Sequence, residues 1–89
     1  MASSYNTVTV DTTADEIIPF NAQRSGLVIK NNGSVIVYIV FDASVTTSNG
    51  IPIVPQDSFT LMGTTIFKTA VYGITSSASA DVRWFDWAI

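Results

Sequence analysis

Hydrophobic and polar residues alternate along most of this chain, and no segment shows the helical hydrophobic spacing of about 3.6 residues. Valine, isoleucine and threonine supply about a third of the residues, a bias toward pleated strands. Seven or eight short strands are predicted, with turn signals at the spacing of about 8 to 12 residues that is typical of sandwiches. We therefore predict an all-β fold, a small antiparallel β-sandwich or jelly-roll-like barrel.

Outside the centre of the chain, the strand pattern falls in residues 6–10, 17–20, 51–55, 58–62, 71–75 and 80–87. Prolines at positions 19, 52 and 55 remove backbone N–H donors. Segment 17–20 is therefore expected at a strand edge or end, and segment 51–55 is expected as an edge strand or an extended crossing. The alternation in segment 80–87 gives it two faces. One face carries Ala80, Val82 and Trp84, and the other carries Asp81, Arg83, Phe85 and Trp87.

The stretch from residue 26 to residue 41 contains two strand-forming runs around Asn32-Gly33. This dipeptide predicts a tight antiparallel hairpin, because both residues tolerate the positive φ of a type I′ turn. The second run, residues 35–41, is apolar at every position, whereas a strand with one face in water should alternate. Both of its faces therefore need cover, and we expect Val35, Val37 and Ile39 to contact a partner.

The 89 residues predict one β-sandwich domain over residues 1–89, with a short flexible arm at about residues 1–5. No cysteine is present to form a disulfide, and only 12% of the residues are charged against 47% hydrophobic. A small domain of this composition is expected to gain stability by docking or by association with copies of itself. The run of residues 35–41, which is apolar on both faces, motivates the hypothesis of a homotrimer.

The end of the chain places Phe85, Trp87 and Ile89 on the face opposite Val82 and Trp84. Both sets cannot lie in the same core. Tryptophan and phenylalanine are enriched at interface hot spots, so Phe85, Trp87 and Ile89 are candidate docking residues. The alternative is that the strand bends near position 86 and the tail folds over an open end of the sandwich.

The catalytic and metal-binding residue types are sparse. Histidine and cysteine are absent, which removes the usual general base, the thiolate nucleophile and the common zinc ligands. Asp11, Asp15 and Glu16 lack the alternation and the turn glycine of a calcium loop and are interpreted as solvated turn residues. We expect no enzyme activity, no catalytic residues, no cofactor and no metal site.

Four basic residues, Arg24, Lys30, Lys68 and Arg83, are spread along the chain. They form no cluster that could neutralise a run of phosphates, so no direct nucleic-acid binding is expected. Arg24 is interpreted as a solvated residue beside a strand, with a partner contact as the alternative. The longest apolar run, residues 35–41, is far shorter than the roughly 20 residues that span a bilayer, and no secretory signal is seen, so we expect a protein made in a cytoplasm with no membrane partner.

Five blocks of sequence, in order, resemble small structural proteins of tailed bacteriophages. They are residues 24–33 (Arg24 through Asn31, Asn32 and Gly33), 37–39, 46–55 (Thr46, Asn49, Gly50, Ile51, Pro52, Ile53, Pro55), 71–75 and 80–83. The resemblance covers residues 24 to 83. It implies a virion component that binds the outer capsid surface as a decoration or cement protein, with the major capsid protein as its partner. Similar sequences end soon after the Ala-Asp-Val-Arg strand, whereas this chain continues with an aromatic tail.

The expectation is therefore a virion protein, made in the cytoplasm of the bacterial host, that stabilises a capsid by burying apolar surface. Two other functions stay open. One is a receptor-binding or glycan-binding module of a phage tail or fibre, because aromatic residues on a sheet can stack on sugar rings. The other is a regulator or inhibitor that is not part of the particle.

Overall fold

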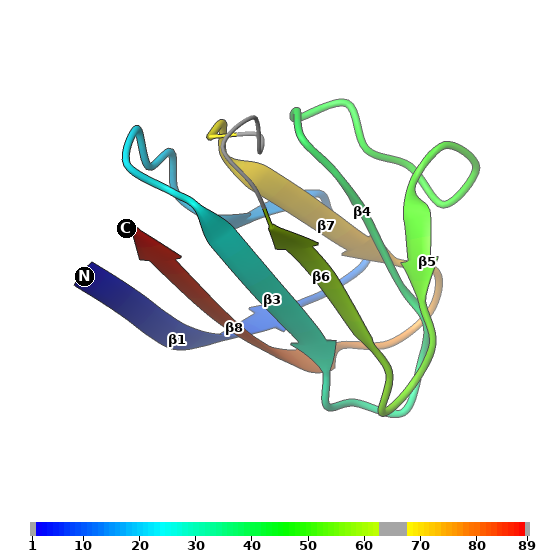
Figure 1. Ribbon diagram of the computed structural model, residues 1–89. Helices are drawn as coiled ribbons and strands as arrows, with labels where there is room; N and C mark the ends of the chain where they lie inside the picture. Colours follow the sequence, from blue (N-terminus) through cyan, green and yellow to red (C-terminus); the bar gives the residue numbers. More distant parts are fainter. Residues whose placement is uncertain (1, 63–67, 89) are drawn as a thin grey trace.

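The structure, a computed structural model, describes residues 2–62 and 68–88 and consists of strands joined by turns and loops (Figure 1). The strands are β1 (Ala2–Val10), β2 (Asp15–Ile18), β3 (Gly26–Asn31), β4 (Val37–Val40), β5 (Ile51–Ile53), β6 (Ser58–Met62), β7 (Val71–Thr75) and β8 (Ala80–Ala88). The predicted all-β fold is confirmed. The part of the chain that the structure describes contains no helix able to cross a membrane.

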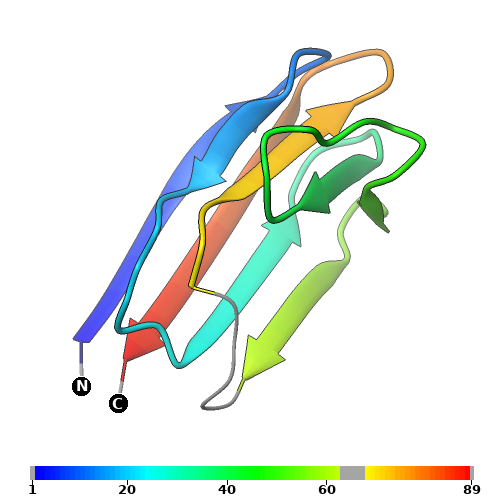
Figure 2. The same cartoon turned by 90° about the horizontal axis from the view of Figure 1, so that it is seen from above.

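The strands form two antiparallel four-stranded sheets packed face to face, as the view from above shows (Figure 2). Sheet A has the order β1-β8-β3-β6, and sheet B has the order β2-β7-β4-β5. Each strand of sheet A therefore has a sequence neighbour at the same position in sheet B. This is the strand order of an eight-stranded jelly roll, in which the chain winds between two sheets around one core.

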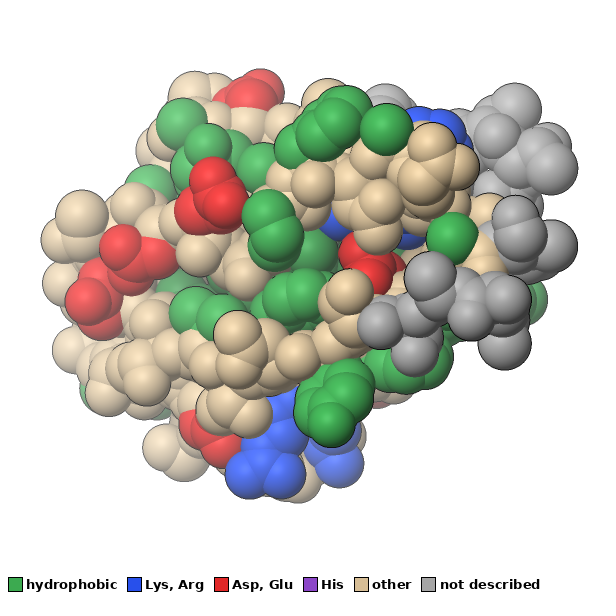
Figure 3. Space-filling view, turned by 90° about the vertical axis from the view of Figure 1, so that its left-hand side faces the viewer, with side chains coloured by type: hydrophobic (Ala, Val, Ile, Leu, Met, Phe, Trp, Pro, Cys, Tyr) green, Lys and Arg blue, Asp and Glu red, His purple; other side chains and the backbone are tan. Residues whose placement is uncertain are grey.

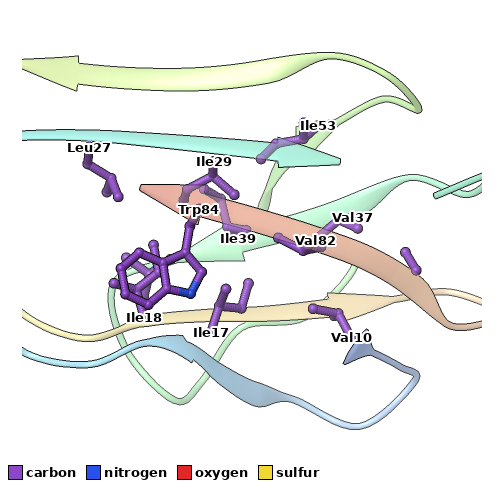
Figure 4. Packing of buried hydrophobic residues seen from close by; sticks show 12 residues of the cluster. Val10, Ile17, Ile18, Leu27, Ile29, Val37, Ile39, Ile53, Val82 and Trp84 are labelled. Atoms are coloured by element: carbon purple, nitrogen blue, oxygen red, sulfur yellow. The ribbon is translucent and has the colours of Figure 1, made fainter. Parts of the chain in front are cut away.

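The core lies between the sheets because the strands alternate inward and outward residues. Figure 4 shows inward side chains from both sheets meeting around Trp84. The fully buried set includes Val10, Ile18, Leu27, Ile29, Val37, Ile39, Val71 and Val82. The face of segment 80–87 that carries Ala80, Val82 and Trp84 is the inward one, since all three belong to this cluster.

Both proline-containing segments form edge strands of sheet B, as predicted. β2 ends just before Pro19, and β5 carries Pro52. The second Asn-Gly pair, Asn49-Gly50, lies in a turn, in which the Gly50 backbone N–H donates to the Thr46 carbonyl over 3.0 Å. This turn belongs to the connection between β4 and β5, which pair with each other in sheet B.

The predicted hairpin at Asn32-Gly33 is wrong. β3 pairs with β6 and β8 in sheet A, whereas β4 pairs with β5 and β7 in sheet B, so this dipeptide lies where the chain crosses between the sheets. A type I′ turn needs positive φ at both central residues. Asn32 does not adopt it, since Gln56 at 69° is the one non-glycine residue of the described chain with positive φ.

The neighbouring Asn31 stabilises this crossing. Its side chain is fully buried, and its Nδ2 donates to the carbonyls of Val35 at 2.7 Å and Ile53 at 2.8 Å. Its Oδ1 accepts from the Gly33 backbone N–H at 2.9 Å. One amide thus satisfies three backbone groups at the crossing, and it connects the end of β3 to β5 in the opposite sheet.

The N-terminal segment also differs from expectation. Residues 2–5 belong to β1 and pair with β8, with Ala2 opposite Ala88 and Tyr5 opposite Phe85. The structure therefore has a nine-residue edge strand where a loose arm was expected. The first and last strands lie side by side, with both ends of the described chain at the same end of sheet A (Figures 1 and 2).

Arg24 is not solvated, contrary to the sequence interpretation. Its side chain is fully buried, and its Nε lies 3.2 Å from Asp86 Oδ2, which is also buried. Its guanidinium donates to the carbonyls of Thr69 at 3.1 Å and Pro19 at 2.8 Å. These contacts hold the loop after β2 against the end of β8 and the segment before β7. The Arg24 guanidinium therefore joins three segments at one end of the sandwich.

Replacing Arg24 should be far more damaging than replacing Arg83. Arg24→Ala leaves the Asp86 carboxylate buried without its cation, a change that costs about 3–5 kcal/mol. Domains of this size have an unfolding free energy of only about 5–13 kcal/mol. Arg83→Ala is the matched control, because Arg83 pairs with Asp81 at nearly the same distance, 3.3 Å, but on the exposed surface.

The control substitution should cost less than about 1 kcal/mol, because solvent screens exposed pairs. Urea unfolding followed by far-UV circular dichroism measures both values. Equal losses for the two variants would contradict the assigned role of the buried pair.

Candidate interaction surface

The outer face of sheet A carries larger and more exposed aromatic and apolar side chains than the outer face of sheet B. Five residues on four strands form this aromatic face: Tyr5, Val28, Met62, Phe85 and Trp87. Tyr5 is 81% exposed, Met62 73% and Phe85 41%. The register explains the grouping, because Tyr5, Phe85 and Val28 are directly opposite one another on three neighbouring strands.

Phe85 and Trp87 contact each other within this face. Their ring centroids are 5.5 Å apart with the planes tilted by 34°, a separation within the range of favourable aromatic pairs. Trp87 also lies directly over Gly26 of β3. A Cβ atom at Gly26 would lie 1.9 Å from Trp87 Cζ2, so only glycine leaves room for the indole ring at this position.

The alternative in which the tail folds over an end of the sandwich is wrong. β8 continues without interruption to Ala88, paired with β1 on one side and with β3 on the other. Asp86 points inward to Arg24, which leaves Phe85 and Trp87 facing outward. The structure thus brings these two predicted docking residues together, whereas Ile89 lies outside the described residues.

The other three predicted interface residues are placed differently. Val37 and Ile39 are fully buried in the core, which corrects their assignment, because neither side chain can reach a partner. Val35 is half-buried and packs against the same core. The apolar outer face of sheet B, here called the tyrosine face, consists of the half-buried Tyr38, Val40, Tyr72 and Ile74.

The sequence reasoning missed Tyr5, Val28 and Met62 as members of the aromatic face. The alternation around Val28 already placed it opposite the inward Leu27 and Ile29. Its neighbour Phe85 is distant in the sequence, however, and the expected hairpin gave β3 the wrong partner. Tyr5 was assigned to a loose arm, and the alternation of Val8 and Val10 with threonines does not extend back to it, because Asn6 is polar.

Basic residues border the aromatic face. Lys30 on β3 is directly opposite Arg83 on β8, one step along from the Val28 and Phe85 pair. A shallow hollow of about 190 Å³ lies here, lined by Val28, Lys30, Arg83, Trp84 and Phe85. The space-filling view shows basic atoms gathered at the lower edge of the molecule, next to hydrophobic side chains (Figure 3).

Asp11 precedes β2, and Asp15 and Glu16 are its first two residues. Asp11 Oδ1 accepts from the Thr13 backbone N–H at 2.9 Å, as in an ordinary polar turn. Burial raises the pKa of Asp15, and the nearby Asp11 carboxylate raises this pKa further. Among residues 2–62 and 68–88, no three acidic side chains are grouped closely enough to hold a metal ion.

No protein-family model and no curated protein matches this sequence. Among solved structures, the solution NMR structure of a de novo designed double-stranded β-helix has a TM-score of 0.57 and 11% identity, covering 98% of this chain and 100% of that chain. A protein of Bacillus endospore appendages, which form disulfide-linked pili, has a TM-score of 0.58 and 15% identity, covering 99% and 86%. Both likenesses show the fold alone.

The packing of Trp87 on Gly26 can be tested with a double-mutant cycle. Gly26→Ala should lower the free energy of unfolding by about 1–3 kcal/mol, because the new methyl group displaces the indole ring. In a Trp87→Ala background the same substitution should cost less than about 1 kcal/mol, since the clash is gone. Chemical denaturation of the four proteins measures this coupling. An unchanged cost in the second background would place the indole elsewhere.

Proposed function

We propose that this chain is a non-enzymatic structural protein of a bacteriophage particle, which binds the outer capsid surface and stabilises it as a decoration or cement protein. The aromatic face of sheet A is the observation that carries the docking part of this proposal. The bacteriophage context comes from the sequence resemblance over residues 24 to 83. The major capsid protein is the proposed partner, and the chain is made in the cytoplasm of the host bacterium.

The exposure of the aromatic face supports docking over a purely structural role for these side chains. Tyr5, Met62 and Phe85 remain 41% or more exposed, although the two sheets bury a complete core without them. Aromatic residues and methionine are enriched at protein interfaces. Tyr5, Met62 and Phe85 do not belong to the core cluster, so a partner can cover them without changing the core. Residues kept on the surface in this way are best explained by a partner that removes them from water.

The magnitudes fit a cement role. An interface of about 800 Å² on this chain gives about 20 kcal/mol of gross hydrophobic stabilisation at 25 cal/mol per Å². Lost translational and rotational freedom removes most of this gain. A modest net affinity is sufficient, however, because many copies on a symmetric shell act together.

Self-association into a homotrimer is also part of the proposal. The tyrosine face of sheet B supports it, because Tyr38 pairs with Ile74 and Val40 with Tyr72, which gives a second apolar surface on the opposite side of the molecule. In this arrangement the copies contact one another through the tyrosine face, and the aromatic face meets the capsid.

A second candidate function is a glycan-binding or receptor-binding module of a phage tail or fibre. The hollow beside Phe85 favours it, because an exposed aromatic ring next to polar side chains can stack on a sugar. The two functions differ in stoichiometry, since a tail carries few copies of a receptor-binding protein and a shell carries hundreds of copies of a cement protein.

Quantitative mass spectrometry of purified particles tests the proposal directly. The number of copies of this chain is measured against the major capsid protein in virions of the phage that encodes it. We expect hundreds of copies per particle. A handful of copies would favour the tail or fibre function, and complete absence would exclude any virion role.

The docking face is tested by Phe85→Ala, which should weaken binding to purified particles at least tenfold, or about 1.4 kcal/mol. The melting temperature should stay within about 3 °C of the parent value, because Phe85 lies outside the core. Phe20→Ala is the matched control, since Phe20 is 65% exposed and lies beyond the end of β2. Equal binding losses for the two variants would argue against the aromatic face as the contact.

A further inference from the structure

Lys30 and Arg83 form a like-charge pair in the middle of a sheet face. They lie directly opposite each other on the neighbouring antiparallel strands β3 and β8, with both side chains pointing outward. Like charges at directly opposite positions destabilise a sheet. The chain has only four basic residues in 89, and two of the four lie opposite each other at this point.

The other two basic residues are occupied inside the fold. Arg24 is buried against Asp86, and Lys68 Nζ donates to the Arg24 carbonyl at 2.8 Å. Arg83 forms an ion pair with Asp81, but the Oδ2 atom of Asp81 also accepts a hydrogen bond from Asn32 Nδ2 at 3.2 Å. Within residues 2–62 and 68–88, Lys30 makes no ion pair. The exposed positive charge of this acidic protein, net −3, is therefore concentrated beside the aromatic face.

The hollow combines this charge with an apolar site. Val28 and the exposed ring of Phe85 form one side, and Lys30 and Arg83 form the other. Its volume of about 190 Å³ is comparable to that of one large apolar side chain, which would lie on the hollow with one side covered, because the hollow is shallow and open to solvent. The site thus fits an apolar group with a negative charge next to it.

We propose that the hollow is the specificity site of the aromatic face and binds a partner segment in which an aromatic or large aliphatic residue is flanked by carboxylates. The apolar side chain packs on Val28 and Phe85, and the carboxylates lie between Lys30 and Arg83, where they relieve the repulsion of the like-charge pair. This inference rests on the proposed function for the identity of the larger partner and adds the chemistry that the partner must present.

A peptide partner is favoured over nucleic acid and over a free anion. Two neighbouring cations can neutralise only a few phosphates, and nucleic-acid sites use more. An inorganic anion would leave the apolar side of the hollow in water. An acidic and apolar peptide segment satisfies both halves of the site.

The test is a titration of ¹⁵N-labelled protein by NMR with three capped tripeptides: aspartate-phenylalanine-aspartate, asparagine-phenylalanine-asparagine and aspartate-alanine-aspartate. The first should shift the amide signals of Val28, Lys30, Arg83 and Phe85 and bind at least fivefold more tightly than either of the others. Inorganic phosphate and N-acetylneuraminic acid are titrated in the same way. Equal binding of the neutral peptide, or tighter binding of the phosphate or the sugar, would overturn the inference.

Lys30→Gln provides the second arm. It should abolish the preference for the charged peptide over the neutral one and leave the melting temperature no lower than that of the parent. Ser48→Asp is the control, because it makes the same change in net charge at an exposed position between β4 and β5. If Ser48→Asp also abolished the preference for the charged peptide, the preference would be due to the net charge of the protein, and the proposed binding site would be wrong.

The titration needs no virions, so its failure and that of the proposed function are distinguishable. Absence of the chain from virions leaves a positive titration intact, and a negative titration leaves the copy number unaffected.

Discussion

The register between β3 and β8 is the constraint on which the rest of the structure depends. It places Ile29 opposite Trp84 in the core and, on the outer side, Val28 opposite Phe85, Lys30 opposite Arg83 and Gly26 under Trp87. A shift of one residue would exchange the two faces of β8 and put Phe85 and Arg83 into the core. The core and the candidate interaction surface are therefore specified together by one set of backbone hydrogen bonds.

Buried polar side chains fix the parts of the fold that the strands alone do not determine. Asn31 satisfies the backbone where the chain passes from sheet A to sheet B, and Arg24 with Asp86 joins three segments at one end. Burying such groups is costly unless every partner is in place, so each of them disfavours other ways of connecting the same strands. We infer that this selection of one topology is the reason for an ion pair inside a domain with so few charges.

The sequence was informative about local structure and much less about pairing. Alternation located the strands, the prolines identified both edge strands of sheet B, and the two faces of segment 80–87 were assigned correctly. The local turn signal at Asn32-Gly33 was misleading, because the contacts of Asn31 with Val35 and Ile53 decided the path of the chain. Arg24 looked solvated, because its partner Asp86 is distant in the sequence. Phe85 and Trp87 were identified from their face on the strand, whereas Tyr5 and Val28 needed the pairing of β8 with both of its neighbours.

The pairing of Ala2 with Ala88 also has a mechanical consequence. A force applied between the start of β1 and the end of β8 acts across the two strands, so their hydrogen bonds would load and break one after another. Such peeling resists far less force than shear along the strands, in which all bonds share the load. If the molecule is held by its outer sheet faces instead, the load passes through the packed sandwich and not through this junction. A pull on the two ends of the chain is therefore expected to separate β1 from β8 before the packed sheets come apart.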